Sequence, residues 1–304
     1  MSDLIESSIS EVPVVVLDTE TTGLFPGVGH RVVELAAIRM ETSSSRVWRV
    51  TDQFSQLINP GRSMDPDASR INGILDEDLL GKPSFEDISE EIFALTEGAL
   101  LVAHNAQFDA SFLGMELHIM NIYKPRRDYY GIPNPWLCTL MVARRNFHFG
   151  NNSLGHIARM LGVRTGRAHR ALGDVFTTAE VLKRMIDELA RRGIVLVGDL
   201  LHAQGGPIYT PVVPKIELPH PIDKALVGGR QLRIQYDGPG GMMVHNVNPQ
   251  YATEYNGRQY LITYCDSRRD QRTFRVDKIL KAEILEGGES LLSGKYVDDR
   301  EAQD

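Results

Sequence analysis

The chain of 304 residues has a mass of 34.0 kDa, which favours two domains over one. Hydrophobic residues make up 42% and charged residues 24%, the proportions of ordinary globular proteins, so a disordered chain is excluded. The net charge of −7 is unevenly spread, because residues 222–280 hold nine of the 33 Lys/Arg and six of the 40 Asp/Glu. Screening limits attraction between charges to about 8 Å, so this basic region matters more for partners than the total charge.

Features of secreted and membrane proteins are missing from the sequence. The apolar run Val12–Leu17 is far shorter than a membrane span, and no Lys or Arg precedes Arg31, as a secretory signal would require. The two cysteines, Cys138 and Cys265, are too far apart in the sequence to suggest a disulfide framework or a cysteine zinc site. We therefore expect a cytoplasmic chain without a membrane partner.

Residues 12–58 have the pattern of strands. The apolar runs VPVVVLD and VVELAAIRM predict two buried strands, and RVWRV and FSQLI predict two more after a polar turn. A loop rich in proline and glycine is expected from about residue 60 to residue 73.

The next part of the chain alternates between helices and a strand. Apolar spacing predicts helices over 85–95, 109–120, 152–161 and 172–189, and ALLVAH predicts a short strand before the second of them. Asn152 or Ser153 is the expected cap of the third helix. Strands followed by this alternation indicate a mixed α/β sheet covered by helices.

The amino-acid composition of the chain changes after residue 193. Five prolines between 205 and 221 exclude a helix or a central strand there and predict a semi-rigid linker. Beyond it, LRIQY, MMVHNVNP, QYLITYC and RTFRV are short strands separated by turns, as in a small β-barrel. The predicted organisation is a domain over 1–195, a linker over 196–221, a barrel over 222–287 and an acidic tail over 288–304.

Two carboxylates mark the end of the first strand. Asp18 and Glu20 are two residues apart, so their side chains share one face of the strand, and a divalent cation would offset their repulsion. The alternative is a solvated strand end. The tight turn Thr21–Leu24 that follows favours a ligand site, because its amides and the Leu24 side chain are placed to meet a ligand.

Two further segments carry acidic residues at helix starts. In HNAQFD, Asp109 opens a helix directly after a buried strand, and in HRALGD, His169 precedes Asp174 by five residues. In α/β folds such strand ends line the site crevice, but an acidic residue in a first helical turn is also a routine stabiliser.

The ordered segments LDTETTGL, HNAQFD and HRALGD resemble the three motifs of DnaQ-like, DEDDh-type 3′–5′ exonucleases over about residues 12–190. ELAAI, INP with INGI, and SLGHIARMLGV extend the resemblance. It implies an RNase H-like mixed sheet with flanking helices. It also implies that Asp18, Glu20, Asp109 and Asp174 hold two Mg²⁺ or Mn²⁺ ions and that His169 is the general base. Two such cations activate water and stabilise the leaving oxygen, and a histidine titrates in the working range.

Some residues near these three motifs have more than one expected role. The resemblance implies that Thr21, Gly23 and Leu24 contact the terminal nucleotide, while Asn105 either supports the site or forms a turn. We expect structural roles for Glu34, Phe108, His104, His148 and His156. Five arginines near the third motif contact phosphates or form a solvated face: Arg144, Arg145, Arg164, Arg167 and Arg170.

The C-terminal region, residues 222–285, resembles a WYL domain, a small Sm/SH3-like β-barrel that binds nucleic acid or other ligands. The resemblance is carried by GRQLRIQY, the VNP turn, QYLITYC with Gln259-Tyr260-Leu261 in place of the namesake tripeptide, and RTFRVDKIL. Candidate ligand-binding residues interleave cations and aromatic rings: Arg233, Tyr236, Tyr260, Arg268, Arg272 and Arg275. The alternative is that these arginines pair with Asp266, Asp270 and Asp277.

The resulting hypothesis is a metal-dependent 3′–5′ exonuclease acting on single-stranded DNA or RNA, with a C-terminal sensor of nucleic acid or ligand. One alternative is a polymerase proofreading subunit, although the linker and barrel take the place where such subunits hold their polymerase. The other is a non-catalytic regulator that binds nucleic-acid ends. The C-terminal domain is also a candidate surface for a homodimer or a protein partner.

Overall fold

The computed structural model describes residues 2–42, 47–123, 132–165, 170–214, 216–265 and 268–289. The chain folds into two compact units, each built from more than one stretch of chain. The first unit comprises Met1–Leu24, Arg31–Pro60 and Met64–Val212. The second comprises Phe25–His30, Gly61–Ser63 and Val213–Asp304.

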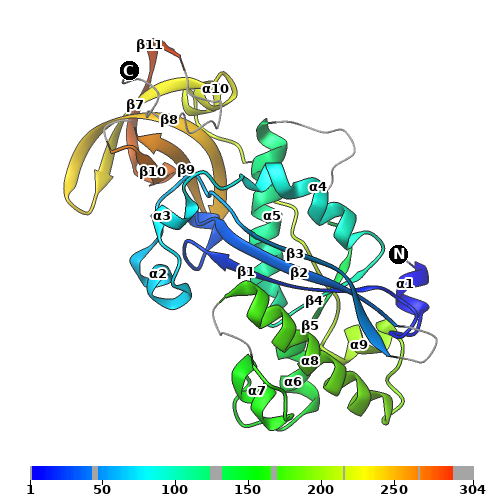
Figure 1. Ribbon diagram of the computed structural model, residues 1–304. Coiled ribbons are helices and arrows are strands. Elements are labelled where there is room, and N and C mark those ends of the chain that lie inside the picture. The colour runs from blue at the N-terminus through cyan, green and yellow to red at the C-terminus, as the bar shows by residue number, and fades with distance from the viewer. Residues whose placement is uncertain are drawn as a thin grey trace. The chain divides into compact units, whose positions relative to one another are not determined.

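The first unit is organised around a six-stranded mixed sheet with the order β3-β2-β1-β4-β5-β6 (Figure 1). β1 is antiparallel to β2 and parallel to β4, which is in turn parallel to β5. The strands are β1 (Val14–Thr21), β2 (Val32–Thr42), β3 (Trp48–Leu57), β4 (Leu100–Ala103), β5 (Pro135–Cys138) and β6 (Ile208–Tyr209).

Helices cover both faces of this sheet. They are α1 (Ser2–Glu6), α2 (Pro66–Asn72), α3 (Asp76–Leu79), α4 (Phe85–Thr96), α5 (Ala106–Tyr123), α6 (Thr139–Asn146), α7 (Leu154–Met160), α8 (Ala171–Ala190) and α9 (Val197–Ala203). Val14 and Val16 of β1 pack in one core cluster with residues of α6 to α9, whereas Val15 and Leu17 pack in another with residues of α4 and α5. Alternation along β1 therefore decides which residues face α8 and which face α5.

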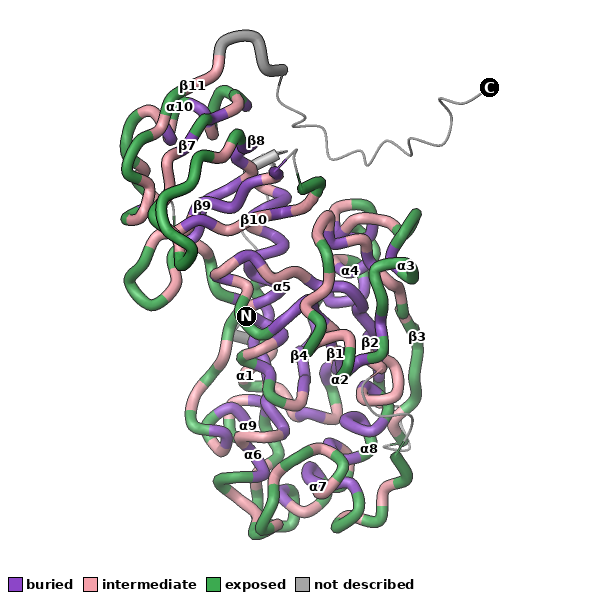
Figure 2. Tube along the Cα trace, turned by 90° about the vertical axis from the view of Figure 1, so that its left-hand side faces the viewer, coloured by how far each residue is buried: buried purple, intermediate pink, exposed green. Residues whose placement is uncertain are grey.

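The central strands are buried along most of their length, and the edge strand is not (Figure 2). Apolar runs without alternation are typical of strands covered on both faces, which explains why VPVVVLD and VVELAAIRM predict β1 and β2 correctly. β3 is a single strand, Trp48–Leu57, where the sequence suggested two.

Helix α2 lies where the sequence predicted only a loop. Asp65 caps it by accepting a hydrogen bond from the Asp67 amide at 2.9 Å, and Pro66 occupies the first helical position, where a proline is tolerated. Gly73 ends it with a left-handed φ of 71°. The same residues that indicate a loop are thus the start and stop signals of a short helix.

The second unit contains a five-stranded antiparallel sheet with the order β10-β9-β8-β7-β11. Its elements are η1 (Pro26–Val28), α10 (Ile222–Val227), β7 (Arg230–Gly238), β8 (Gly241–Tyr255), β9 (Arg258–Cys265), β10 (Asp270–Arg275), η2 (Val276–Lys278) and β11 (Ile279–Glu289). Within the described residues β10 and β11 are the two ends of the order, so the sheet is open and the closed barrel expected from the sequence is not found.

The proline-rich segment is a linker only in its later part. Val197, Leu200 and Leu201 of α9 lie in the core of the first unit. The Trp136 indole donates a hydrogen bond to Thr210 Oγ1 at 3.0 Å, which ties the residues after β6 to β5. The predicted domain limit at residue 195 therefore lies before the end of the first unit at Val212.

Residues 290–304, which include most of the predicted acidic tail, lie outside the described residues. No helix among the described residues is long and apolar enough to cross a membrane.

Candidate active site

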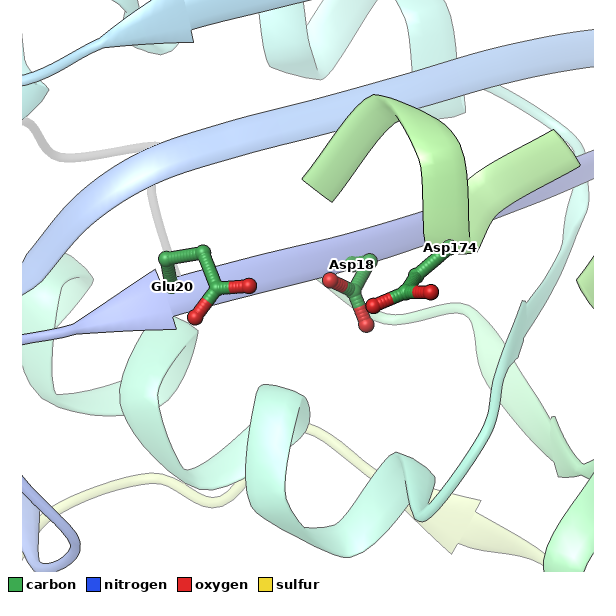
Figure 3. Close-up of side chains that lie close together, drawn as sticks. All are labelled: Asp18, Glu20 and Asp174. Carbon is green, nitrogen blue, oxygen red and sulfur yellow. The ribbon is translucent and has the colours of Figure 1, made fainter. Parts of the chain in front are cut away.

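Three carboxylates gather at the end of the central strand. Asp18 and Glu20 extend from β1 on the face covered by α8, and Asp174 lies in the first turn of α8 (Figure 3). One carboxylate oxygen of each residue lies within 4.8 Å of one from each of the others. The structure therefore brings together three of the four predicted metal ligands, from segments more than 150 residues apart.

Asp109, the fourth predicted ligand, lies beside this group in the first turn of α5. It is 2% exposed, and its Oδ1 accepts hydrogen bonds from the Thr19 amide at 3.0 Å and the Thr19 hydroxyl at 2.8 Å. β4 runs parallel to β1, so α5, which follows β4, begins beside the end of β1. The fold thus places all four carboxyl groups at one edge of the sheet.

The pKa values show how much these carboxylates repel one another. Burial raises the pKa of Asp18 well above its usual range, and the charges of Asp109 and Glu20 raise it further. Burial and then the charge of Glu34 raise the pKa of Glu20 to about 7. Burial raises the pKa of Asp109 to about 7 against the hydrogen bonds from Thr19. Bound cations would offset both the desolvation and the repulsion, so these residues fit a divalent metal site.

Glu34 connects the β1–β2 pair to α8. It lies opposite Glu20 in the strand register and is 4% exposed. Arg170 donates to both of its carboxylate oxygens, at 2.8 Å from Nη2 and 3.1 Å from Nε, and the Ala171 amide donates to it at 3.1 Å. These bonds satisfy an amide of the first turn of α8, the turn that carries Asp174. The structural role expected for Glu34 is thus the anchoring of this helix, and Arg170 faces a carboxylate of the protein.

Asn72, at the end of α2, is a site neighbour that the sequence analysis missed. Its side chain donates to the Thr21 carbonyl at 3.4 Å and accepts from the Ile74 amide at 3.0 Å. A hydrogen bond from Asn72 also opposes the rise in the pKa of Glu20. The sequence feature that points to this residue is the INGI segment, in which Asn72 stands directly before a glycine.

The turn after β1 contains the predicted nucleotide contacts. Thr21 is buried, and its hydroxyl donates to the Gly23 carbonyl at 2.7 Å, which fixes the turn. Leu24 is 65% exposed. Asn105 is exposed and has a φ of 75°, and its carbonyl accepts from the Phe108 amide, so it forms the turn between β4 and α5.

The predicted general base, His169, lies outside the described residues together with Arg167. Among the other histidines, His104 is held between Thr139 Oγ1 at 2.9 Å and the Asn152 carbonyl at 3.0 Å. Burial lowers the pKa of His104 to about 4, so it is neutral and donates from Nε2 to the carbonyl. These contacts agree with the structural role expected for it.

A pocket of about 570 Å³ adjoins the carboxylates on the α8 side. Asp174 and Thr177 of α8 line it together with Arg159 of α7 and Arg164. Arg164 was one of the five arginines for which phosphate contact and a solvated face were equal alternatives. Its position in the wall of this pocket favours phosphate contact.

In the second unit, two of the predicted ligand residues meet at one aromatic ring. Tyr236 packs edge-on against Phe274 with ring centroids 4.9 Å apart, and the Arg272 guanidinium lies 5.7 Å from the same ring. Arg272 Nη1 is buried without a hydrogen-bond partner among the described residues. The ring of His245, which the sequence analysis did not select, lies 5.2 Å from the Phe274 ring, between centroids, and is tilted by 51° to it. Burial and the charges of Arg272 and Arg268 lower its pKa.

Of the remaining ligand candidates, Arg275 meets this cluster through its backbone, because its amide donates to the Tyr236 hydroxyl at 3.4 Å. Arg275 forms an ion pair with Asp277, as the alternative interpretation expected. Tyr260 lies opposite Arg275 in the β9–β10 register. Arg233 is exposed and donates to Asn246 Oδ1 at 3.2 Å.

The aspartates proposed as partners of these arginines give a mixed result. Asp270 accepts hydrogen bonds from the amides of Ser63 and Gln271. Asp266 lies outside the described residues.

Two family models match this chain. One, described as an exonuclease of the RNase T type, matches residues 15–182, and a WYL domain model matches residues 218–284. The DNA polymerase III subunit epsilon of Escherichia coli (strain K12) is 31% identical over 198 residues, which are 63% of this chain and 78% of that subunit.

Other relatives are much longer proteins. The PolC-type DNA polymerase III of Thermotoga petrophila is 31% identical over 69% of this chain but only 14% of the polymerase. A solved structure of exonuclease I superposes with a TM-score of 0.51 at 15% identity, covering 90% of this chain and 64% of that protein. At this identity the superposition shows a shared fold.

Proposed function

The chain belongs to the exonuclease family of DnaQ- and epsilon-like proteins, and we propose that it is a metal-dependent 3′–5′ exonuclease acting on single-stranded DNA or RNA. The observation that carries the proposal is the convergence of Asp18, Glu20 and Asp174 beside Asp109 at one edge of the sheet. Asp109 is buried and the other three carboxyl groups are half-buried, so their like charges repel one another and have no structural benefit by themselves. Their arrangement is what phosphodiester hydrolysis with divalent cations requires.

We assign Asp18, Glu20, Asp109 and Asp174 to hold two Mg²⁺ or Mn²⁺ ions. An all-oxygen ligand set suits these hard cations better than softer ones. When bound, such ions lower the pKa of water and neutralise the charge that develops on a phosphodiester. The protein's own contribution is to orient these carboxylates, through Thr19 for Asp109 and through the anchored start of α8 for Asp174.

The turn that follows β1 supports an assignment of substrate contacts. Leu24 presents an exposed apolar side chain four residues after Glu20, where a terminal base can pack against it. Thr21, Gly23 and Asn105 complete the proposed set around the terminal nucleotide. His169, five residues before Asp174, is proposed as the base that accepts the proton of the attacking water.

The proposal is tested with 5′-labelled single-stranded DNA and RNA of one sequence, incubated with Mg²⁺, with Mn²⁺ or with EDTA. We expect a ladder that shortens from the 3′ end, disappears in EDTA and is absent for Asp109→Asn. The polymer that is degraded faster, DNA or RNA, identifies the preferred sugar. A purified, folded chain that cleaves neither polymer with either ion would refute the activity.

A proofreading subunit is the second candidate, because several curated relatives are named as polymerase III epsilon subunits. A proofreading role predicts stable association with a replicative polymerase and faster removal of a mismatched 3′ nucleotide than of a paired one. Equal rates on both primers and no co-elution with a polymerase would favour the stand-alone exonuclease. Retained end binding without cleavage would instead favour a non-catalytic regulator.

We further propose that the second unit senses an anionic ligand or a nucleic-acid strand. The support is the cluster around Phe274, where Arg272 has a buried donor without a hydrogen-bond partner in the part of the chain that the structure describes and Tyr236 offers a ring for stacking. Arg272→Ala is expected to weaken binding of a single-stranded oligonucleotide, whereas Arg233→Ala, on an exposed site, serves as the control. Equal binding by both variants and the unmodified chain would exclude this site.

A further inference from the structure

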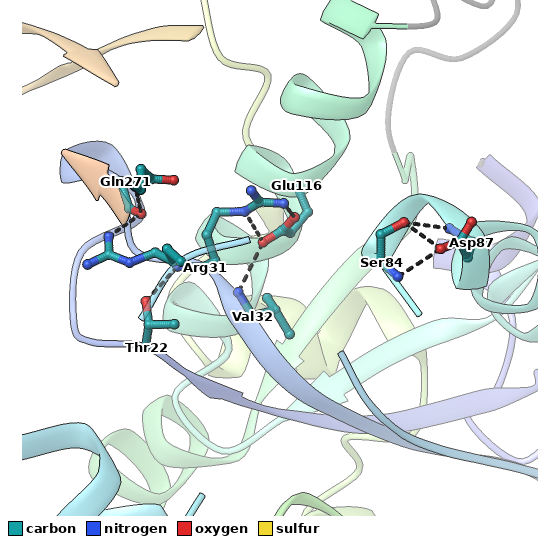
Figure 4. A network of polar contacts seen from close by, with 9 residues as sticks. Thr22, Arg31, Val32, Ser84, Asp87, Glu116 and Gln271 are labelled. Carbon is teal, nitrogen blue, oxygen red and sulfur yellow. Dashed lines mark hydrogen bonds and ion pairs between the residues drawn. The ribbon is translucent and has the colours of Figure 1, made fainter. Parts of the chain in front are cut away.

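Helix α5, which carries Asp109, is attached to the β1–β2 pair at two points. At the first point, Asp109 accepts two hydrogen bonds from Thr19 of β1. At the second point, Glu116 accepts from the Val32 amide at 3.0 Å and from the Arg31 guanidinium at 2.8 Å and 2.6 Å (Figure 4). Asp109 and Glu116 are seven residues apart, about two helical turns, so both carboxylates leave the same face of α5.

Arg31 is in turn tied to the chain that follows β1. The Thr22 amide donates to the Arg31 carbonyl at 2.8 Å, and the Arg31 amide donates back to Thr22 Oγ1 at 3.0 Å (Figure 4). Thr22 stands two residues after Glu20, past the irregularity in the β1–β2 register between Glu20 and Thr21. The backbone from which the guanidinium extends is therefore fixed next to a proposed metal ligand.

Together these contacts form a closed ring between the two elements. One side of the ring runs from Thr19 through Asp109 into α5. The other side returns from Glu116 through Arg31 to Thr22. A single attachment would leave α5 able to pivot about it, whereas two attachments on one face fix the position of the helix along β1. Such supporting contacts hold metal ligands in the geometry that binding requires.

The chemistry of the Arg31–Glu116 ion pair favours a positioning role over a gain in stability. The Glu116 side chain is 2% exposed and that of Arg31 is 15% exposed. Taking such charges out of water offsets much of their attraction, so apolar side chains of similar volume would stabilise the fold about as well. What the planar guanidinium adds is direction, because its Nε and Nη2 donors meet the two carboxylate oxygens in a fixed orientation.

We propose that Arg31 and Glu116 are positioning residues of the metal site. They fix α5 against β1 and so fix the carboxylate of Asp109 relative to the carboxylates that β1 carries. This inference rests on the metal-dependent activity proposed above, and it assigns to that activity two residues outside the proposed set of metal ligands.

The test measures Mn²⁺ binding to the full-length chain by titration calorimetry, which does not depend on cleavage. Arg31→Lys keeps the positive charge but replaces the two-point contact with Glu116 by a single ammonium group. Arg31→Gln removes the charge, and by charge alone the loss of a cation would tighten Mn²⁺ binding.

Asn134→Ala is the matched control for a loss of stability. Asn134 donates two buried hydrogen bonds within the first unit, to the Thr96 and Ala99 carbonyls ahead of β4, and α5 follows the other end of that strand. Thermal unfolding in EDTA reports the stability of each variant.

We expect both Arg31 variants to bind Mn²⁺ more weakly, with a Kd about tenfold higher for Arg31→Lys, the lower end of the effect of removing a contact that orients a metal ligand. Asn134→Ala is expected to keep the Kd of the unmodified chain even where its melting temperature falls as much. Arg31→Lys decides the question alone if Arg31→Gln does not fold.

The outcomes separate this inference from the proposed activity. If the unmodified chain binds Mn²⁺ and Arg31→Lys has the same Kd, or if Asn134→Ala shows an equal rise, the positioning role is refuted alone. Tighter binding by Arg31→Gln would also refute it. An unmodified chain that binds no Mn²⁺ refutes the proposed metal site and this inference together.

Discussion

At the scale of single residues, the site is dominated by the cost of keeping carboxylates buried and close together. Asp18, Glu20 and Asp109 each have a raised pKa, and burial is the largest cause in every case. Thr19 partly offsets this cost for Asp109, because it donates two hydrogen bonds to one oxygen. The metal-free site is therefore strained electrostatically, and proton uptake or metal binding relieves the strain.

Asp109→Asn is expected to abolish cleavage without loss of stability. The amide keeps an oxygen that accepts from Thr19 but loses the charge that holds a cation, so we expect kcat/KM to fall at least about a hundredfold. Asp109→Ala is the matched comparison, because it strands the buried Thr19 donors and costs about 1–3 kcal/mol of unfolding free energy. Urea unfolding and initial rates check both statements, and full activity of Asp109→Asn would remove Asp109 from the metal site.

The metal-free protein is expected to lose stability as the pH rises. The pKa values of Glu20 and Asp109 are about 7 in the folded chain, above their ordinary values of 4.5 and 3.8. The folded state therefore binds more protons than the unfolded state, and the unfolding free energy falls as pH rises from about 4 to about 7.

Thermal unfolding in EDTA across about pH 5 to about pH 8 measures this dependence. Saturating Mn²⁺ should reverse the decline, because it binds the deprotonated carboxylates. Glu20→Gln/Asp109→Asn is the control and should flatten the curve. A metal-free chain whose melting temperature rises across this range would contradict the raised pKa values.

At the scale of elements, strand and helix ends carry the chemistry. Asp18 and Glu20 end β1, Asp109 begins α5 and Asp174 begins α8. The start of α8 is anchored by Glu34 on β2, so its position depends on a contact between elements that no local pattern indicates. Short elements were the hardest to predict: the start and stop signals of α2 also indicate a loop, and α9 is stabilised by the packing of Val197, Leu200 and Leu201 in the core of the first unit.

Arg170→Ala is expected to weaken both stability and cleavage. Its partner Glu34 has only 5% of its side chain exposed, but Arg170 is 37% exposed, so solvent screens part of the ion pair. We therefore expect the free energy of unfolding to fall by about 1–3 kcal/mol. An unpaired Glu34 also adds repulsion to Glu20, which weakens Mn²⁺ binding.

Arg192→Ala, which breaks an exposed ion pair with Glu188 at the other end of α8 and a hydrogen bond to the Asn146 carbonyl, provides the control and should lower stability less than Arg170→Ala. Urea unfolding and Mn²⁺ titration calorimetry report the two effects. Equal behaviour of the two variants would show that Arg170 does not anchor the helix.

At the scale of the whole molecule, the order of the chain does not match the order of the units. Residues 25–30 and 61–63 come from within the exonuclease segment but belong to the second unit. β10 presents Gln271 and Thr273 to this loop, while Arg272 between them lies beside Phe274 in the proposed ligand cluster. Within the second unit, β10 therefore contacts both the segment 25–30 and the ring of Phe274.

Truncation after Val212 is expected to weaken substrate binding. It removes residues 222–280 with their local charge of +3, which flattens the dependence of KM on salt. KM measured at several salt concentrations for the full and the truncated chain checks this, and an unchanged slope in the truncated chain would exclude a strand-binding role for those cations.

The sequence by itself indicated the family and the main elements. Patterns that act over a few residues identify β1, β2, α5 and α8, because alternation and helical spacing are local properties, and the spacing of Asp18 and Glu20 already places them on one face. Tertiary structure decided everything that depends on segments distant in the chain. It brought Asp174 to β1, paired Glu34 with Arg170, left the C-terminal sheet open and assigned residues 25–30 to the second unit. Such contacts arise from packing between remote segments, and no periodicity in the sequence encodes them.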